Sequence, residues 1–248
     1  MKTVKIYSTF ALMLIVLLSL TSNNTKAQLK TPSSVGKYEK GTITLKKGKE
    51  IEGYIYIDML NPQEFQKRVN FINEKTHEAF LKGKKINKDI EVYKANDLQS
   101  ITLENGQNFK KAKYVNILAT RKQDMLPKNL MLEVVTEGKV TIYKKHHHTQ
   151  GFVSSYLPDR TEVNDAEYVA FQENNFEILY QKEGAGAKNM SVINIKALVG
   201  DNVVVLDNYD KDYYGFQTLF TKGPVFESSF QLDALEAFTK LVEDYNKQ

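Results

Sequence analysis

The chain contains neither cysteine nor tryptophan in its 248 residues. Without cysteine there are no disulfides, no thiolate nucleophiles, no cysteine-ligated zinc or iron–sulfur centres, and no anchor cysteine of a lipoprotein. The fold is therefore held by non-covalent contacts, or at most by a metal site of His and carboxylate ligands. With 42% hydrophobic and 26% charged residues, the composition is that of a globular chain and excludes the collagen-like and wholly disordered classes.

The local signatures of common hydrolases and phosphate-binding loops are also lacking. There is no Gly-x-Ser-x-Gly, His-Glu-x-x-His or Gly-x-x-x-x-Gly-Lys segment, and the glycine-rich run at 184–187 lacks the spacing of a phosphate loop. Two carboxylates brought together by folding leave no local motif, so the sequence leaves a paired-carboxylate hydrolase open. We assign no catalytic, cofactor-binding or metal-binding residue and expect no cofactor.

Residues 1–27 have the pattern of a secretory signal peptide. A basic start at Lys2 is followed by the apolar run Phe10–Leu20, and small residues precede a cut before Gln28. A retained transmembrane anchor, the alternative, requires about 20 apolar residues, and this run is shorter. We therefore expect export by signal peptide to the periplasm, the outer-membrane surface or the medium.

The mature chain begins with a segment, 28–35, that we expect to be a flexible arm. No later apolar stretch reaches membrane length, so we expect no transmembrane segment in the mature chain.

The charges are unevenly distributed. Removing Lys2, Lys5 and Lys26 with the leader leaves 31 basic and 30 acidic residues, so the overall charge gives no case for nucleic-acid binding. Residues 28–148 carry a net charge of +9, however, and residues 149–248 carry −8. We expect the acidic C-terminal part to dock on the lysine-rich part, held mainly by apolar contacts. The alternative is that the basic half is an open face for anionic polymers such as envelope polysaccharide.

Short strands separated by turn residues predict a mainly antiparallel β domain over residues 36–183. Lys47-Gly48 and Asn105-Gly106 are predicted hairpin turns, the second of type I′, and Asn174-Asn175 is another of the same kind. The lysine-rich segment 75–88 is expected to be a solvated loop. The expected strands are 42–45, 51–57, 69–72, 90–93, 98–103, 109–118, 167–173 and 176–182.

A further hairpin is predicted over residues 130–143. If Glu137-Gly138 is a two-residue loop, Leu132 faces Tyr143, and apolar residues lie on both faces of the hairpin. Such a hairpin belongs in the middle of a sheet that is covered on both sides.

The run 184–187 is expected to be a mobile connector and the best internal boundary, after which comes a smaller α/β segment, 188–248. Within that segment we expect a short helix or a strand at 191–199, a strand at 203–206 and a terminal amphipathic helix at 233–246. The sequence therefore predicts an α+β fold.

The terminal helix has a start signal and one apolar stripe. Asp233 and Glu236 have the spacing of a capping box, which predicts that the helix begins there. The apolar residues at helical spacing are Leu235, Phe238, Leu241, Val242 and Tyr245.

The segments Gly41–Gly53, Leu132–Tyr143 and Val242–Asn246 resemble a family of uncharacterised exported β-rich proteins from Gram-negative bacteria. The similarity extends loosely over residues 36–246, and its motifs are hairpin and helix-end patterns. The family has no assigned activity. The resemblance implies an exported β-rich fold and no functional residues.

Three adjacent histidines, His146–His148, are the most conspicuous cluster. On an extended segment the first and third point the same way, and His77, Glu78 or an acid from 159–167 would have to complete a metal site. The alternative is that the histidines begin a flexible loop. Because three neighbours lack the separated spacing of a preformed site, we expect no high-affinity metal.

An acidic loop contains Asp207, Asp210 and Asp212 and suggests calcium, but an EF-hand register would place Thr221 where the bidentate Glu belongs. A solvated acidic turn is the favoured interpretation.

Tyr54, Tyr56, Tyr213 and Tyr214 are candidates for a carbohydrate- or peptide-binding face. Cross-strand packing is the commoner role of such pairs.

The leading functional hypothesis is an exported, non-enzymatic module that binds another envelope component, protein or glycan. The alternative is a secreted hydrolase with a carboxylate or His–metal site. A deep pocket with converging, pKa-shifted carboxylates would favour the enzyme, and a flat aromatic or charged face would favour binding. The sequence predicts no oligomeric state.

Overall fold

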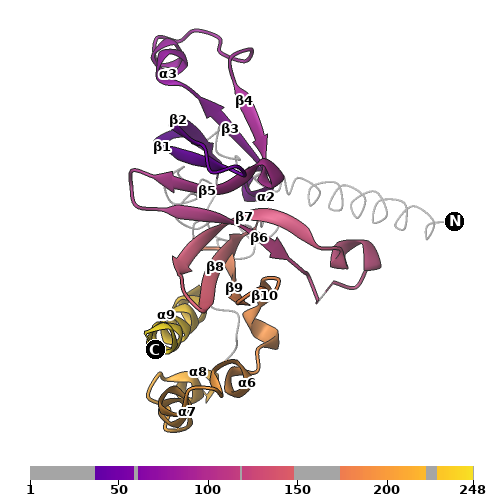
Figure 1. The fold of residues 1–248 in the computed structure, drawn as a ribbon, viewed down its shortest axis with the longest axis vertical. Helices are drawn as coiled ribbons and strands as arrows, with labels where there is room; N and C mark the ends of the chain where they lie inside the picture. Colours follow the sequence, from indigo (N-terminus) through magenta and orange to yellow (C-terminus); the bar gives the residue numbers. More distant parts are fainter. Residues whose placement is uncertain (1–36, 59–60, 118, 148–173, 222–227, 248) are drawn as a thin grey trace, which may run out of the picture.

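The computed structural model describes residues 37–58, 61–117, 119–147, 174–221 and 228–247. Their strands form one antiparallel sheet with the order β10-β9-β8-β7-β6-β5-β1-β2-β3-β4 (Figure 1). The strands are β1 (Lys37–Leu45), β2 (Glu50–Ile57), β3 (Arg68–Ile72), β4 (Glu91–Lys94), β5 (Leu98–Leu103), β6 (Asn108–Tyr114), β7 (Lys128–Thr136), β8 (Val140–His146), β9 (Phe176–Lys182) and β10 (Lys188–Asn189).

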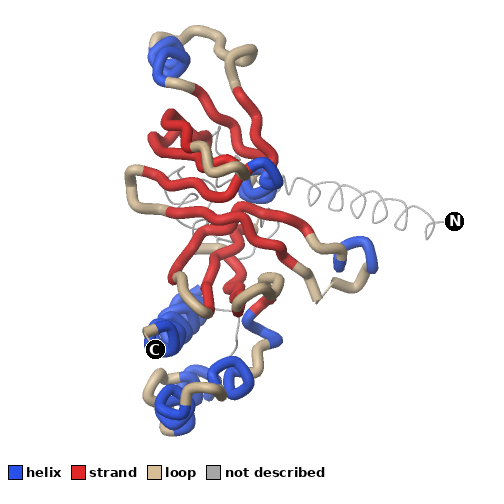
Figure 2. Tube along the Cα trace, in the orientation of Figure 1, coloured by secondary structure: helices blue, strands red, loops and turns tan. Residues whose placement is uncertain are grey.

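Helices lie at both ends of the sheet, with α3 at one end and the C-terminal helices at the other (Figure 2). None of the described helices is both long and apolar enough to span a bilayer. The predicted α+β, mainly antiparallel architecture is confirmed. The helices are α2 (Pro62–Lys67), α3 (Glu74–Leu81), α6 (Ile195–Val199), α7 (Val203–Asp210), α8 (Phe216–Thr221) and α9 (Ser228–Asn246), with 3₁₀ turns η1 (Ala95–Asp97), η2 (Lys122–Met125) and η3 (Met190–Val192).

Glycines occupy the turns of the β1–β2 and β5–β6 hairpins. The Leu103 N–H donates to the Gln107 carbonyl over 2.9 Å, and Gly106 has a φ of 91°, whereas Asn105 does not have a positive φ. The predicted type I′ turn is therefore wrong, because such a turn needs two left-handed residues. The geometry is that of a three-residue loop with glycine at the left-handed position, and Gly48, with a φ of 82°, has the same role between β1 and β2.

The β7–β8 hairpin is central, as predicted, but its register differs from the prediction. Tyr143 lies opposite Val134 instead of Leu132, and Thr136 lies opposite Ile142. A β-bulge adds one residue to β7 between these two pairs. Because both faces of the hairpin are apolar, alternation alone does not reveal such a shift. Ile142 and Tyr143 point to opposite faces and are both buried, which agrees with cover on both sides.

Two helices replace segments for which the sequence predicts a loop and a strand. Most of α3 lies in the expected loop 75–88, and the expected strand 203–206 is the first turn of α7. In each case the side chain of an asparagine before the helix, Asn73 or Asn202, accepts a backbone N–H from the first turn. This capping favours the helix over the strand that the β-branched residues suggest. The segment 191–199, left open between helix and strand, holds η3 and α6.

The terminal helix is longer than predicted. It begins at Ser228, so Asp233 and Glu236 lie inside it and do not form the expected capping box. Its apolar stripe is confirmed, because it packs in one cluster with Val140 and Ile142 of β8. The stripe consists of Leu235, Phe238, Leu241, Val242 and Tyr245.

The run 184–187 is a turn anchored to the sheet, so the expected mobile connector is wrong. The backbone N–H of Ala187, a fully buried residue, donates to the Lys113 carbonyl over 2.8 Å. A Cβ added to Gly186 would lie 3.0 Å from that same oxygen. Small residues here permit the close approach of the turn to β6.

Two apolar clusters lie on one face of the sheet, with polar residues between them. The register pairs Phe109 with Glu133 and Glu133 with Lys144, so these side chains share a face with Ile142. On that face one cluster covers β1–β3 and β5, and another lies between β8–β9 and the C-terminal helices. A third cluster covers the opposite face of β6–β9.

Candidate functional site

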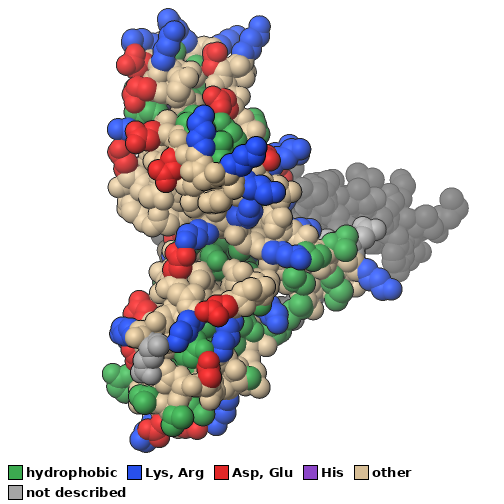
Figure 3. Space-filling view, in the orientation of Figure 1, with side chains coloured by type: hydrophobic (Ala, Val, Ile, Leu, Met, Phe, Trp, Pro, Cys, Tyr) green, Lys and Arg blue, Asp and Glu red, His purple; other side chains and the backbone are tan. Residues whose placement is uncertain are grey.

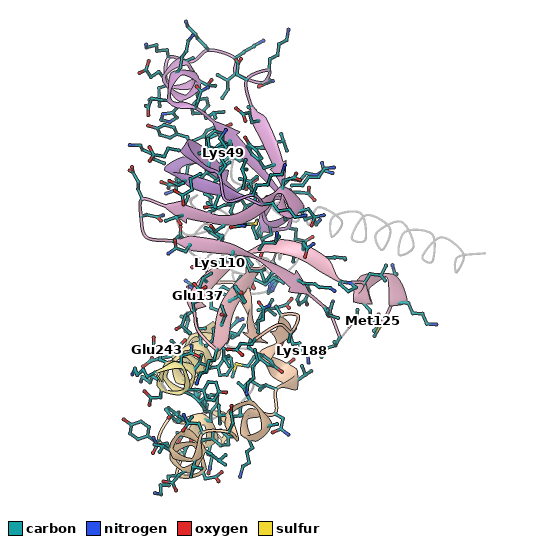
Figure 4. The ribbon with its side chains drawn as sticks, in the orientation of Figure 1. Lys49, Lys110, Met125, Glu137, Lys188 and Glu243 are labelled. Atoms are coloured by element: carbon teal, nitrogen blue, oxygen red, sulfur yellow. The ribbon has the colours of Figure 1, made fainter. Side chains whose placement is uncertain are left out.

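A groove of about 760 Å³ lies beside β9, between the edge of the sheet and the C-terminal helices. The chain from β10 through η3 to α6 forms one wall, and α7, α8 and α9 contribute the rest. Figure 4 places Lys188, on β10, at this edge of the sheet. The volume falls within the range of about 300–1,000 Å³ typical of ligand sites. The apolar lining consists of Ile178, Met190, Ile193, Ile195, Tyr209, Phe216, Leu219 and Ala234.

Two asparagines fix the wall that follows β10. The Asn189 Oδ1 accepts the Ser191 N–H over 2.8 Å and starts η3, and the Asn194 Oδ1 accepts the Ala197 N–H over 3.1 Å and starts α6. Each side chain satisfies a donor that the helix start leaves open. The rim of the groove is thereby held by local hydrogen bonds.

Glu177 is the one carboxylate that lines the groove within the described residues. Its Oε1 lies 2.7 Å from the Lys145 ammonium, and its Oε2 accepts from the Tyr114 hydroxyl over 3.2 Å and from the Asn189 amide over 3.1 Å. Burial raises the pKa of Glu177, but the charge and hydrogen bond of Lys145 outweigh it and hold the pKa below its ordinary value. Glu177 is therefore an ionised structural group and a poor proton donor.

The other charged side chain of the lining is also paired. Lys196 lies 2.6 Å from Asp210 on α7. The groove therefore presents an apolar floor with no uncompensated charge.

The edge of β9 beside the groove has no strand partner among the described residues. β10 pairs only with Leu179 and Tyr180, and after Asn189 the chain turns away into η3. The backbone of β9 from Phe176 to Ile178 pairs with β8 on one side only, within the part of the chain that the structure describes. Such an edge is open to pairing with an additional extended segment.

The histidines predicted as metal candidates are not brought together. His146, buried in β8, lies 2.6 Å through its Nε2 from Glu133, His147 follows on the opposite face, and His148 lies outside the described residues. His77 belongs to α3, at the far end of the sheet, and stacks on Tyr54 with ring centroids 3.6 Å apart. Within the described ranges no three potential metal ligands cluster.

The three candidate calcium ligands have separate structural roles. Asp207 on α7 pairs with Lys211, the residue that follows this helix, and Asp210 pairs with Lys196. Asp212, with a φ of 56°, accepts the N–H groups of residues 217 and 218 at the start of α8. The segment is helical for the most part, so the expected solvated turn is only partly right.

The candidate tyrosines do not form one surface. Tyr56 packs across strands against Tyr38 with ring centroids 5.2 Å apart, which confirms the packing interpretation for this pair of strands. Tyr213 and Tyr214 contact each other after α7, at the other end of the molecule.

Comparisons with known proteins add no assignment: no family model, no curated protein and no solved structure matches this chain. The sequence does not identify the groove, its lining residues Glu177 and Asn189, or Lys145, which pairs with Glu177. Neither hydrophobic periodicity nor a motif marks them, because they meet only through the β8–β9 register and the path of the chain after β10.

Proposed function

We propose that this protein is an exported, non-enzymatic binding module whose groove beside β9 receives an extended apolar segment of another envelope protein. The observation that carries the proposal is an apolar groove next to a strand edge that has no partner among the described residues. An extended peptide would pair its backbone with Phe176–Ile178 and insert alternate side chains into the groove.

The chemistry of the lining favours a polypeptide over a glycan. The floor is apolar, and its two charged residues, Glu177 and Lys196, are already paired. A peptide with uncharged apolar side chains loses little hydration on entering such a groove. A glycan would place much of its hydroxyl surface against the apolar side chains of this floor.

No observation favours the hydrolase alternative. A general acid needs a raised pKa, whereas the pKa of Glu177 is lowered. Glu133, another carboxylate paired with a lysine, shares a face of the sheet with Ile178 but does not line the groove, and its pKa is also lowered.

Export belongs to the same proposal and rests on the leader pattern of residues 1–27. Protein recovered from the cell envelope or medium is expected to begin at Gln28, which intact-mass measurement tests. A mass that includes Met1 would contradict export with cleavage.

A substitution that blocks the groove tests its role in peptide binding. Ser191 is exposed on the rim, and Ser191→Trp places a large ring over the groove. Peptides of twelve residues selected on the native protein from a random display library are expected to carry alternating apolar residues. Fluorescence anisotropy should show that Ser191→Trp weakens their binding at least tenfold.

The matched control is Val192→Trp. Val192 is 37% exposed, neighbours Ser191 and does not line the groove, so this variant should bind the peptides as the native protein does. Since the chain has no other tryptophan, the emission of each variant also reports its position. A blue-shifted emission for Ser191→Trp together with undiminished peptide binding would overturn the proposal, as would failure to select any peptide.

A further inference from the structure

A second cavity, of about 340 Å³, lies where α2 ends, β4 runs into η1 and the chain enters β7. Figure 3 shows Lys and Arg side chains gathered around α2 and the adjoining ends of β3 and β4. Apart from Ala95 and Pro127, the lining consists of cationic and amide residues. These are Lys67, Arg68, Lys94, Lys128, Asn96 and Asn129.

The strand register forces two of these cations together. Arg68 is the first residue of β3 and lies directly opposite Lys94, the last residue of β4. Side chains of directly opposed residues share a face and lie within about 4.5–5.5 Å of each other at Cβ, so like charges there destabilise the pair of strands. No carboxylate among the described residues forms an ion pair with Arg68 or Lys94.

Two nearby carboxylates contact other groups of the cavity lining. Glu64 lies 3.1 Å from Lys67, and Asp97 accepts the backbone N–H of Lys94 over 3.1 Å. Arg68 and Lys94 therefore face each other without an ion pair among the described residues, and a bound anion would relieve the repulsion between the two strands.

Two amides complete the lining. The Asn129 Nδ2 donates to the Asn96 Oδ1 over 2.6 Å, and this bond joins η1 to β7. Each amide retains a second polar atom, a donor on Asn96 and an acceptor on Asn129, that suits hydroxyl groups.

We propose that this cavity binds the phosphate group of a small phosphorylated sugar. The planar guanidinium of Arg68 fits two phosphate oxygens, and Lys94 supplies a second charge for a dianion. The amides of Asn96 and Asn129 bind the sugar hydroxyls. The near absence of apolar lining favours a sugar over a lipid, and the volume suits a ligand of this size.

Isothermal titration calorimetry of the full mature chain at low ionic strength tests the proposal. Glucose 6-phosphate is expected to bind more tightly than inorganic phosphate, and glucose is expected not to bind. Arg68→Gln and Lys94→Gln should each weaken glucose 6-phosphate binding at least tenfold. Arg68→Lys should fall between Arg68→Gln and the native chain.

The control is Lys84→Ala combined with Lys85→Ala, which removes two exposed charges on the loop after α3, far from the cavity. This variant should bind glucose 6-phosphate within twofold of the native chain. If the control lost as much affinity as Arg68→Gln and Lys94→Gln, general positive charge would explain the binding and the proposal would be overturned. Absence of binding to the native chain would also overturn it.

Thermal melts separate a loss of binding from a loss of folding. Because Lys94→Gln removes a like-charge contact, its melting temperature in the absence of ligand should equal or exceed that of the native protein. A lower melting temperature would indicate that Lys94 has a structural role and would contradict the assignment.

Discussion

The partly buried Glu133 and the buried His146 form a pair between the two apolar clusters on one face of the sheet. The two side chains approach to 2.6 Å, and Lys144 adds a contact of 3.5 Å to the same carboxylate. The Gln66 amide on α2 donates to the His146 carbonyl over 2.8 Å and so ties α2 to β8. The polar cluster thereby joins the two halves of the sheet.

Replacement of Glu133 by Gln should destabilise the protein at pH 7 by about 2–3 kcal/mol, because it removes the carboxylate that pairs with the partly buried Lys144 ammonium and contacts the buried His146 ring. Burial raises the pKa of Glu133, but His146 and Lys144 outweigh it and leave the pKa below 4.5. A depressed pKa stabilises the folded state above the unfolded value and loses that effect as the pH falls through the folded value. Denaturant unfolding should therefore show the difference between native and variant at neutral pH and its loss in acid, below about pH 4.

Glu137→Gln is the matched control. Glu137 also pairs with a lysine, Lys110, but the carboxylate is 54% exposed (Figure 4). Its replacement should change the free energy of unfolding by less than about 1 kcal/mol. Equal effects of the two substitutions would contradict the role given to burial.

The contact between Glu133 and His146 could not be predicted from the sequence. Glu133 and His146 meet only because a bulge shifts the β7–β8 register, and hydrophobic alternation contains no sign of that bulge. The three adjacent histidines mark the end of β8 in the sequence, but as candidate metal ligands and not as partners of a carboxylate.

At the scale of elements, the end of α9 is fixed to β8 by one side chain. The Val140 N–H donates to the Asn246 Oδ1 over 2.9 Å, and the Asn246 Nδ2 donates to the Val140 carbonyl over 2.8 Å. Gly138, in the preceding turn, leaves room for this amide, since an added Cβ would overlap it.

Asn246→Ala should cost about 1–2 kcal/mol through the loss of both hydrogen bonds. Gly138→Ala should also destabilise, because the added methyl group displaces Asn246. In denaturant unfolding, the double variant should lose clearly less free energy of unfolding than the sum of the losses in the two single variants. The reason is that the amide displaced by Gly138→Ala is already absent in Asn246→Ala. Additive losses would contradict the proposed contact between Gly138, Asn246 and Val140.

Elements were predictable where local chemistry and tertiary packing agree. Gly48 and Gly106 supply the left-handed position of two hairpins and mark them in the sequence. Three consecutive valines predict a strand where the structure has the first turn of α7, because the Asn202 cap and the burial of Val205 favour the helix.

At the scale of the whole molecule, the C-terminal helices share one apolar cluster with the sheet. The stripe of α9, including Phe238 and Leu241, packs on Val140 and Ile142. The ion pair of Lys182 and Asp201 adds little to the stability of this contact, because its N–O distance is 3.5 Å and the Asp201 carboxylate is exposed. Apolar adhesion of the terminal stripe, expected from its spacing alone, is confirmed.

Amide hydrogen exchange of the full chain, with and without the tightest selected peptide, tests the groove most directly. If the peptide adds a strand to the sheet, amides of Phe176–Ile178 should exchange more slowly on binding, and Ser191→Trp should abolish the effect. Tyr180, already paired with β10, should change little. Peptide binding without any added protection along this edge of β9 would contradict the account.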